Sequence, residues 1–276
     1  MSEPASSHAI VSGSFDDLRS RDIRFLEEAS RRGALTVVLW PDEAIQAIQG
    51  KGPRFPLAER IYLLNVIRYV RQVIVAPMDV SPDTLPLDKL PALAGWVVME
   101  GDDTPAKRSF CQAHGVDYHV VRQAELIGFP VLHLLKHNSS HPKVVVTGCY
   151  DWFHSGHVRF FEEASSYGDL YVIVGNDVNV HFLKGEGHPL FAQDERRYIV
   201  QSSRFVHQAL ITSGMGWMDA EPEIDLIKPD IYIVNEDGDQ PEKREFCQQR
   251  GIQYVVLKRA PKPGLVPRQS TDLRGF

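Results

Sequence analysis

Short apolar runs alternate along this chain with longer segments in which apolar residues recur at helical spacing. The clearest run is 144–147, whose three consecutive valines are typical of a parallel strand buried on both faces. From residue 157 onward apolar side chains return every three or four positions, which predicts a helix over 157–167 that ends at Gly168. The same alternation continues to the end of the chain and predicts strands 170–174, 209–211, 231–234 and 254–257 with helices 194–205 and 242–250. This pattern indicates an α/β fold in which helices flank a parallel sheet.

The chain repeats itself at a shift of 135 to 136 residues. Gly13-Ser-Phe-Asp16 aligns with Gly148-Cys-Tyr-Asp151, and the match continues through Glu59-Arg60 on Glu195-Arg196 and Lys107-Arg108 on Lys243-Arg244. A period this long indicates duplicated domains rather than a solenoid of short repeats. We expect two tandem Rossmann-like domains, 1–137 and 142–276, joined by a polar linker over 136–143. The two copies are expected to pack as an intramolecular pseudo-dimer, and further homodimerisation stays open.

The segment Gly148-Cys-Tyr-Asp-Trp-Phe-His-Ser-Gly-His157 carries the clearest chemistry. It lies at a strand-to-helix turn, where unpaired amides and the helix dipole favour a phosphate group. His154 and His157, spaced i and i+3, can donate to one anion and stabilise charge on an attacked phosphoryl centre. Gly148 and Gly156 would let the backbone approach that anion. Nucleotidyl transfer is therefore the leading hypothesis.

Two surface histidines or a zinc site are the alternatives for this histidine pair. A structural zinc needs four ligands, and Cys149 is the only nearby sulfur, expected to point elsewhere on the strand.

The first copy has Arg19-Ser-Arg-Asp22 opposite His154-Ser-Gly-His157. Both imidazoles and the glycine are replaced, and a carboxylate stands where an anion would bind. We therefore expect domain 1–137 to be a degenerate, inactive partner and domain 142–276 to be catalytic.

Further candidates lie outside this segment. Lys184 is expected on a loop that folds over the triphosphate, and its counterpart is Gln49. Arg196 could reach phosphate or brace the sheet, and the latter is favoured because Arg60 persists in the first copy. Asp151 likewise persists as Asp16, which favours a role in the turn.

The C-terminal tail offers a second set of candidate ligands. Ser270 and Thr271, beside Arg268, could hold the β and γ phosphates or simply cap a helix. The acidic turn 235–239 lies at the same sheet edge and could contact base, ribose or magnesium, or be only a turn.

Over residues 142–276 the chain resembles the cytidylyltransferase-like nucleotidyltransferases. Residues 148–157 are similar to the family's G-x-[FY]-D-x-x-H-x-G-H signature, which includes Cys149, Tyr150 and Asp151. The resemblance implies that His154 and His157 hold the phosphates and stabilise the transition state, that Lys184 contacts the substrate or α-phosphate, and that Ser270 and Thr271 close over the triphosphate. It also implies Mg²⁺ carried by the triphosphate and no metal ligands in the protein. Because the stretch 260–269 separates Arg259 from Ser270, either Arg259 or Arg268 could be the arginine of the family's last motif.

The resemblance leaves the substrates open. The tandem halves look like ethanolamine-phosphate cytidylyltransferases, with glycerol-3-phosphate cytidylyltransferases in the same family. Residues 183–189 and 266–271 are closer to the adenylyltransferase domain of ADP-heptose synthesis enzymes. CTP is favoured on family breadth and ATP is the alternative, with a small phosphorylated alcohol, polyol or sugar as acceptor. Rivals are a non-catalytic nucleotide sensor and a redox Rossmann protein, the latter disfavoured because neither first turn has G-x-G-x-x-G spacing.

Composition narrows the partners. Lys and Arg total 30 against 36 Asp and Glu, and both halves of the chain are acidic, so nucleic acid is not expected as a partner. Three scattered cysteines favour a reducing cytoplasm, where buried thiols are expected. No apolar run reaches membrane-spanning length and the polar start is unlike a signal peptide, so no membrane association is expected.

Overall fold

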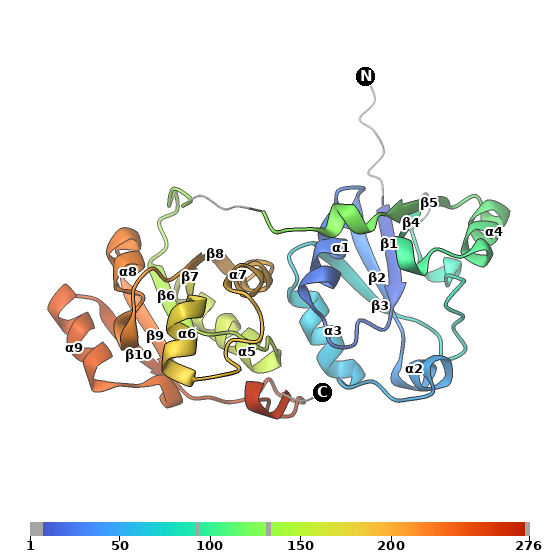
Figure 1. The fold of residues 1–276 in the computed structure, drawn as a ribbon. Coiled ribbons are helices and arrows are strands. Elements are labelled where there is room, and N and C mark those ends of the chain that lie inside the picture. The colour runs from blue at the N-terminus through green and yellow to red at the C-terminus, as the bar shows by residue number, and fades with distance from the viewer. Residues whose placement is uncertain (1–7, 92–93, 131–133, 274–276) are drawn as a thin grey trace, which may run out of the picture. The chain divides into compact units, whose positions relative to one another are not determined.

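The computed structural model describes residues 8–91, 94–130 and 134–273. The chain divides into two compact units, 1–128 and 129–276 (Figure 1). The boundary therefore precedes the polar stretch predicted as the linker. Residues after it contact the second unit: Phe129 stacks on Tyr198, and the Leu135 amide donates to Gln208.

The first unit is a five-stranded parallel sheet flanked by helices. Its strand order is β3-β2-β1-β4-β5, with β1 in the centre. The elements in chain order are β1 (His8–Gly13), α1 (Ser20–Ser30), β2 (Ala34–Leu39), α2 (Asp42–Gln49), α3 (Leu57–Val66), β3 (Val70–Val75), β4 (Ala94–Met99), α4 (Pro105–His114) and β5 (Asp117–Val121).

The second unit repeats this topology with one more helix. Its sheet order is β10-β9-β6-β7-β8, again parallel with the first strand in the centre. The elements are β6 (Lys143–Gly148), α5 (Ser155–Ala164), β7 (Asp169–Val174), α6 (Asp177–Lys184), α7 (Gln193–Gln201), β8 (Val206–Ile211), α8 (Glu221–Ile227), β9 (Ile231–Asn235), α9 (Pro241–Arg250) and β10 (Gln253–Leu257).

The α/β architecture predicted from the apolar pattern is confirmed, with three differences in detail. Helices α2, α6 and α8 were not predicted, because each is only seven or eight residues long and shows too few turns for a clear period. Helix α7 ends at Gln201, four residues before the predicted end. Helix α5 ends at Ala164, and residues 165–167 continue as a 3₁₀ turn.

Both faces of the second sheet are covered, as the valine run of β6 requires. Val144 and Val146 pack with α5 and α7 on one face, whereas Val145 packs with α8 and α9 on the other. Burial of apolar surface stabilises the folded state by about 25 cal/mol per Å². The sheet gains this stabilisation on both faces. Since β7 and β9 lie on opposite sides of β6, the carboxyl end of β6 is the point where the strand order reverses. Ligands bind in this crevice in open α/β sheets.

No helix in the described part of the chain is both long and apolar enough to cross a membrane.

Candidate active site

The turn from β6 into α5 is built around a strained tyrosine and a capping histidine. Tyr150 has φ +54°, and its ring lies 2.8 Å from the position that a Cβ on Gly148 would occupy. His154 is the N-cap of α5 and accepts a 3.0 Å hydrogen bond from the Gly156 amide through Nδ1. A Cβ on Gly156 would lie 2.9 Å from the His154 ring. Both glycines thus make room for side chains of the turn. The sequence analysis expected them to make room for the anion instead.

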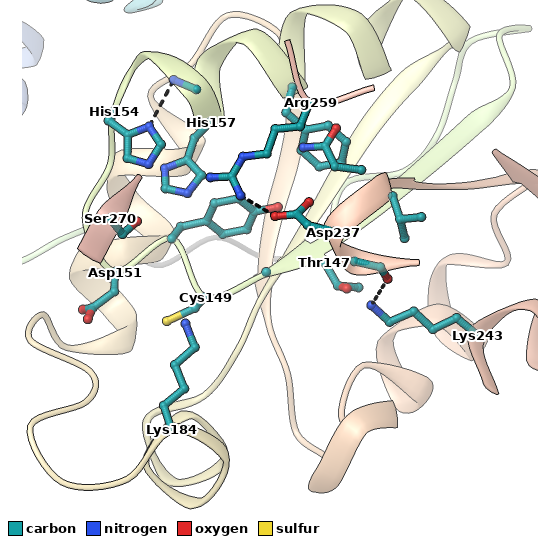
Figure 2. Close-up of a pocket in the computed structure, with 17 residues that line it drawn as sticks. Thr147, Cys149, Asp151, His154, His157, Lys184, Asp237, Lys243, Arg259 and Ser270 are labelled. Carbon is teal, nitrogen blue, oxygen red and sulfur yellow. Dashed lines mark hydrogen bonds and ion pairs between the residues drawn. The ribbon is translucent and has the colours of Figure 1, made fainter. Parts of the chain in front are cut away.

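The two imidazoles lie face to face inside the turn (Figure 2). Their ring centroids are 4.0 Å apart with 24° between the planes. Burial, assisted by Arg259 and Arg268, lowers the pKa of His154 to about 3. Burial, assisted by His154, Arg259 and Lys184, lowers the pKa of His157 well below its usual value. Both rings are therefore neutral at pH 7.

The neutral state determines which nitrogen of His154 carries the proton. Because Nδ1 accepts from the Gly156 amide, the single proton lies on Nε2, which is then a donor. Within the described ranges neither Nε2 of His154 nor Nδ1 of His157 has a hydrogen-bond partner, although both atoms are buried. A buried polar atom without a partner costs about 1–3 kcal/mol, which makes these two nitrogens candidates for a hydrogen bond to a bound group.

These rings line a cavity of about 410 Å³ above the carboxyl ends of β6 and β9. Three cations and two carboxylates line it, which gives a formal charge of +1 with neutral histidines: Lys184, Lys243, Arg259, Asp151 and Asp237. Thr147, Gly148, Cys149, Tyr150, Gly156 and Ser270 also line the cavity. Among the predicted site residues whose side chains are described, only Arg196 and Arg268 lie outside this lining.

Lys184 reaches the cavity from a helix rather than from the expected loop. It is the last residue of α6, and Gly185, with φ +82°, ends the helix after it. The prediction of a loop was wrong because the short α6 was missed. The Lys184 side chain is exposed and lies near the Cys149 thiol, whose pKa is raised by burial and lowered in part by this ammonium. Cys149 itself faces the cavity, so the expectation that it points elsewhere was wrong.

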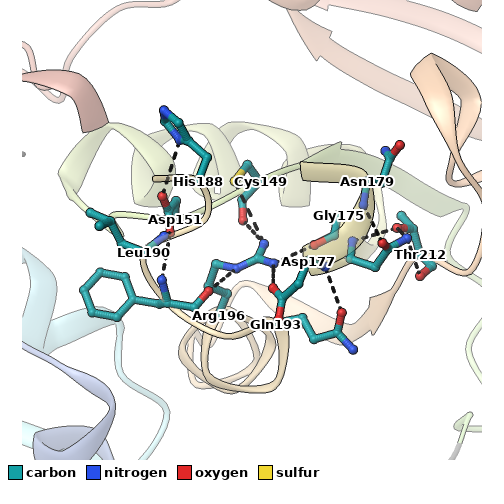
Figure 3. A network of polar contacts seen from close by, with 12 residues as sticks. Cys149, Asp151, Gly175, Asp177, Asn179, His188, Leu190, Gln193, Arg196 and Thr212 are labelled. Carbon is teal, nitrogen blue, oxygen red and sulfur yellow. Dashed lines mark hydrogen bonds and ion pairs between the residues drawn. The ribbon is translucent and has the colours of Figure 1, made fainter. Parts of the chain in front are cut away.

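Arg196 is a buried brace beneath the site (Figure 3). Its guanidinium is fully buried and donates to the carbonyls of Cys149, Gly175 and Phe191 at 2.6–2.8 Å and to Asp177 at 2.7 Å. Arg60 makes the equivalent contacts in the first unit, to Phe55, Ser14, Trp40 and Asp42. The same network occurs in the first unit, which has no histidine pair. We therefore assign it a structural role.

Asp151 anchors the loop between α6 and α7. Its Oδ1 accepts from the amides of Leu190 and Phe191 at 2.7 and 3.1 Å, while its side chain also borders the cavity. Asp16 accepts from the amides of Arg54 and Phe55 in the first unit. The aspartate occurs at this position in both units because both make the same contact to the loop.

The C-terminal segment closes one side of the cavity. Ser270 lines it, and its hydroxyl donates to the Trp152 carbonyl at 3.4 Å. The Thr271 side chain lies outside the described residues. Of the two candidate arginines, Arg259 lines the cavity and forms an ion pair with Asp237. Arg268 lies in a smaller adjoining pocket of about 130 Å³, which Arg259 also borders.

Sequence reasoning missed Lys243 as a cavity residue. Its ammonium donates to the Gly238 carbonyl at 3.2 Å, and burial lowers its pKa. In the first unit the Lys107 ammonium donates the equivalent hydrogen bond to the Asp102 carbonyl at 2.6 Å. The repeat alignment contained both lysines, but only the fold shows that they lie at a cavity.

The parallel sheet, the crevice at the reversal of strand order and the paired imidazoles at a helix start define a nucleotidyltransferase. The chain belongs to the cytidylyltransferase-like family, whose model matches residues 145–273. It is 37% identical over 119 residues to an FAD synthase of Ferroglobus placidus, covering 42% of this chain and 74% of that protein. An FAD synthase of Aciduliprofundum boonei is 34% identical over 119 residues, covering 42% of this chain and 76% of that protein.

A second kind of relative is the bifunctional protein HldE. That of Aliarcobacter butzleri is 38% identical over 102 residues, covering 37% of this chain and 21% of that protein. The match therefore extends over about a fifth of that longer protein.

Proposed function

We propose that the protein is an adenylyltransferase that transfers AMP from ATP to the phosphate of a small phosphorylated acceptor and releases pyrophosphate. The observation that carries the proposal is the pair of neutral, stacked imidazoles at the start of α5, each with a buried nitrogen that has no partner among the described residues. Phosphate oxygens are the acceptors that such donors fit at a helix N-terminus.

ATP replaces CTP as the favoured nucleotide. The sequence analysis favoured CTP only because of the breadth of the family that the chain resembles. Two of the relatives are FAD synthases, and FAD contains an AMP unit joined through a diphosphate. Adenylyl transfer to a phosphate is the step that forms such a bond.

The chemistry needs no nucleophile from the protein. A phosphate oxygen of the acceptor attacks the α-phosphorus, the new P–O bond forms, and the bond to the bridging oxygen breaks with its electron pair on pyrophosphate. His154 and His157 would donate to the oxygens that gain charge, while Lys184 and Arg259 would neutralise the triphosphate. Because the histidines are neutral, they act as hydrogen-bond donors rather than as general acids.

Magnesium would enter the cavity bound to the phosphates of ATP. The described residues contain no group of three or more His, Cys, Asp or Glu side chains placed to hold a metal ion. Of the carboxylates in the cavity, Asp151 is occupied by two amides and Asp237 by Arg259. When bound, the ion would neutralise charge on the β and γ phosphates.

The test is pyrophosphate release from ATP, CTP, GTP and UTP with a panel of acceptors that includes riboflavin 5′-phosphate, glycerol 3-phosphate, phosphoethanolamine and hexose 1-phosphates. We expect turnover with ATP and one acceptor class. Turnover with CTP in preference to ATP would overturn the choice of nucleotide. Tight ATP binding without pyrophosphate from any acceptor would instead favour the nucleotide sensor.

A further inference from the structure

The first unit keeps a cavity at the position equivalent to the candidate active site. Its volume is about 320 Å³, and it lies at the carboxyl ends of β1 and β4. Its lining corresponds position by position to the second-unit cavity: Gly13 to Gly148, Phe15 to Tyr150, Asp16 to Asp151, Phe25 to Phe160 and Lys107 to Lys243. Loss of the histidines has therefore left an open site rather than a filled core.

The charge of this cavity is reversed. Three carboxylates and one cation line it, which gives a formal charge of −2 against +1 in the second unit: Asp16, Asp22, Asp102 and Lys107. Asp22 stands where the second unit has His157, and Gln49 stands where it has Lys184. A triphosphate would be repelled here, whereas a cation would be attracted.

The cavity has also gained one aromatic side chain, Trp40. Trp40 lies where the second unit has Gly175, as shown by the matching amide bonds from Trp40 to the Gly13 carbonyl at 3.0 Å and from Gly175 to the Gly148 carbonyl at 2.9 Å. Phe15 and Phe25 line the same cavity.

We propose that the first unit is a binding site for an organic ammonium ion, held by the carboxylate of Asp22 and by the aromatic side chains that border the cavity, Trp40, Phe15 and Phe25. Aromatic rings attract cations that lie within about 6 Å of the ring centroid. A carboxylate beside such rings adds a charge-assisted contact. The unit therefore has a ligand chemistry of its own, independent of the triphosphate site.

The probe is tetramethylammonium chloride, titrated calorimetrically into the full-length protein with tert-butanol as an uncharged ligand of similar size. We expect one site per chain that binds the cation at least tenfold more tightly than the alcohol and that saturating ATP does not displace. Equal affinity for the alcohol, displacement by ATP or absence of binding would each overturn the proposal.

Two variants locate the site. Asp22→Asn should weaken binding of the cation at least fivefold. Since Asp22 also accepts from the Arg19 amide at the start of α1, a second variant avoids that structural contact. Gln49→Lys places an ammonium at the exposed rim and should weaken binding by a similar factor.

The matched control is Gln46→Lys, which adds the same charge on the same helix outside the cavity lining. It should leave binding within twofold of wild type. An equal loss of affinity for the cation in Gln46→Lys and Gln49→Lys would mean that binding depends only on the net charge of the protein. The proposed site would then be wrong.

Discussion

At the residue scale, burial decides how the two histidines act. In water an imidazole has a pKa of about 6.5 and is partly charged near neutral pH. Here His154 is 1% exposed, and the positive charge of Arg259 acts on both rings, that of Arg268 on His154 and that of Lys184 on His157. Both rings are therefore held neutral, and the positive charge at the cavity comes from the surrounding side chains.

Removing one of these donors should slow catalysis strongly. We expect His157→Ala to reduce the kcat of pyrophosphate release by about 10²–10³-fold, the range found when one preorganised donor is lost from an active site. The exposed His141, whose side chain is 71% accessible, provides the control, and His141→Ala should stay within twofold of wild type. A His157→Ala enzyme within a few-fold of wild type would exclude the assigned role.

The same burial predicts how stability depends on pH. Because the folded-state pKa of both imidazoles is lowered, the unfolded chain binds protons that the folded chain cannot. This contribution to stability is fully present above the unfolded pKa of about 6.5 and is lost as pH falls, by about 1.4 kcal/mol per group per pH unit, until the folded pKa is reached.

Urea unfolding of the second unit at pH 7 and pH 5 would measure this loss. We expect the double variant His154→Asn, His157→Asn to lose less stability than wild type over this interval, because it lacks both groups. An equal loss in the two proteins would show that the imidazoles are not held neutral.

At the scale of elements, a buried arginine joins three segments beneath the site. Arg196 on α7 ties the ends of β6 and β7 to the loop that precedes α7, through its bonds to Cys149, Gly175 and Phe191. The strand ends that carry the candidate site thus depend on one side chain from a helix about 20 to 50 residues away in sequence.

Truncating that side chain should destabilise the second unit. We expect Arg196→Ala to lower its free energy of unfolding by about 3–5 kcal/mol, because three carbonyls lose a buried donor, at about 1–3 kcal/mol for each acceptor left unsatisfied. Chemical unfolding followed by circular dichroism would measure it. A change below about 1 kcal/mol would contradict the bracing role.

At the scale of the whole molecule, two units of the same topology have diverged in chemistry. The contacts that both retain, such as the networks of Arg60 and Arg196, maintain the fold. The positions that differ, such as Asp22 against His157, lie at the cavities. Residues that make the same contacts in both units are therefore assigned to the fold, whereas the residues that differ at the cavities are candidates for function.

This division of roles predicts an asymmetric effect of equivalent substitutions. Arg60→Ala should destabilise the first unit by an amount similar to that of Arg196→Ala in the second, because the two networks match. Under conditions where both units stay folded, its kcat and KM for ATP should stay within twofold of wild type. A large loss of activity in folded Arg60→Ala would show that the first unit takes part in catalysis.

The sequence by itself determined the α/β class, the repeat and the position of the histidine turn, because these follow from local periodicity and from residue types close together in the chain. It missed α6 and α8, whose lengths of eight and seven residues give too few turns for a clear period. The tertiary structure alone decided that Arg259 rather than Arg268 enters the main cavity, that Lys243 borders the site and that both imidazoles are neutral. Each of these properties depends on burial or on partners far away in sequence, and such contacts exist only once the strands and helices have packed.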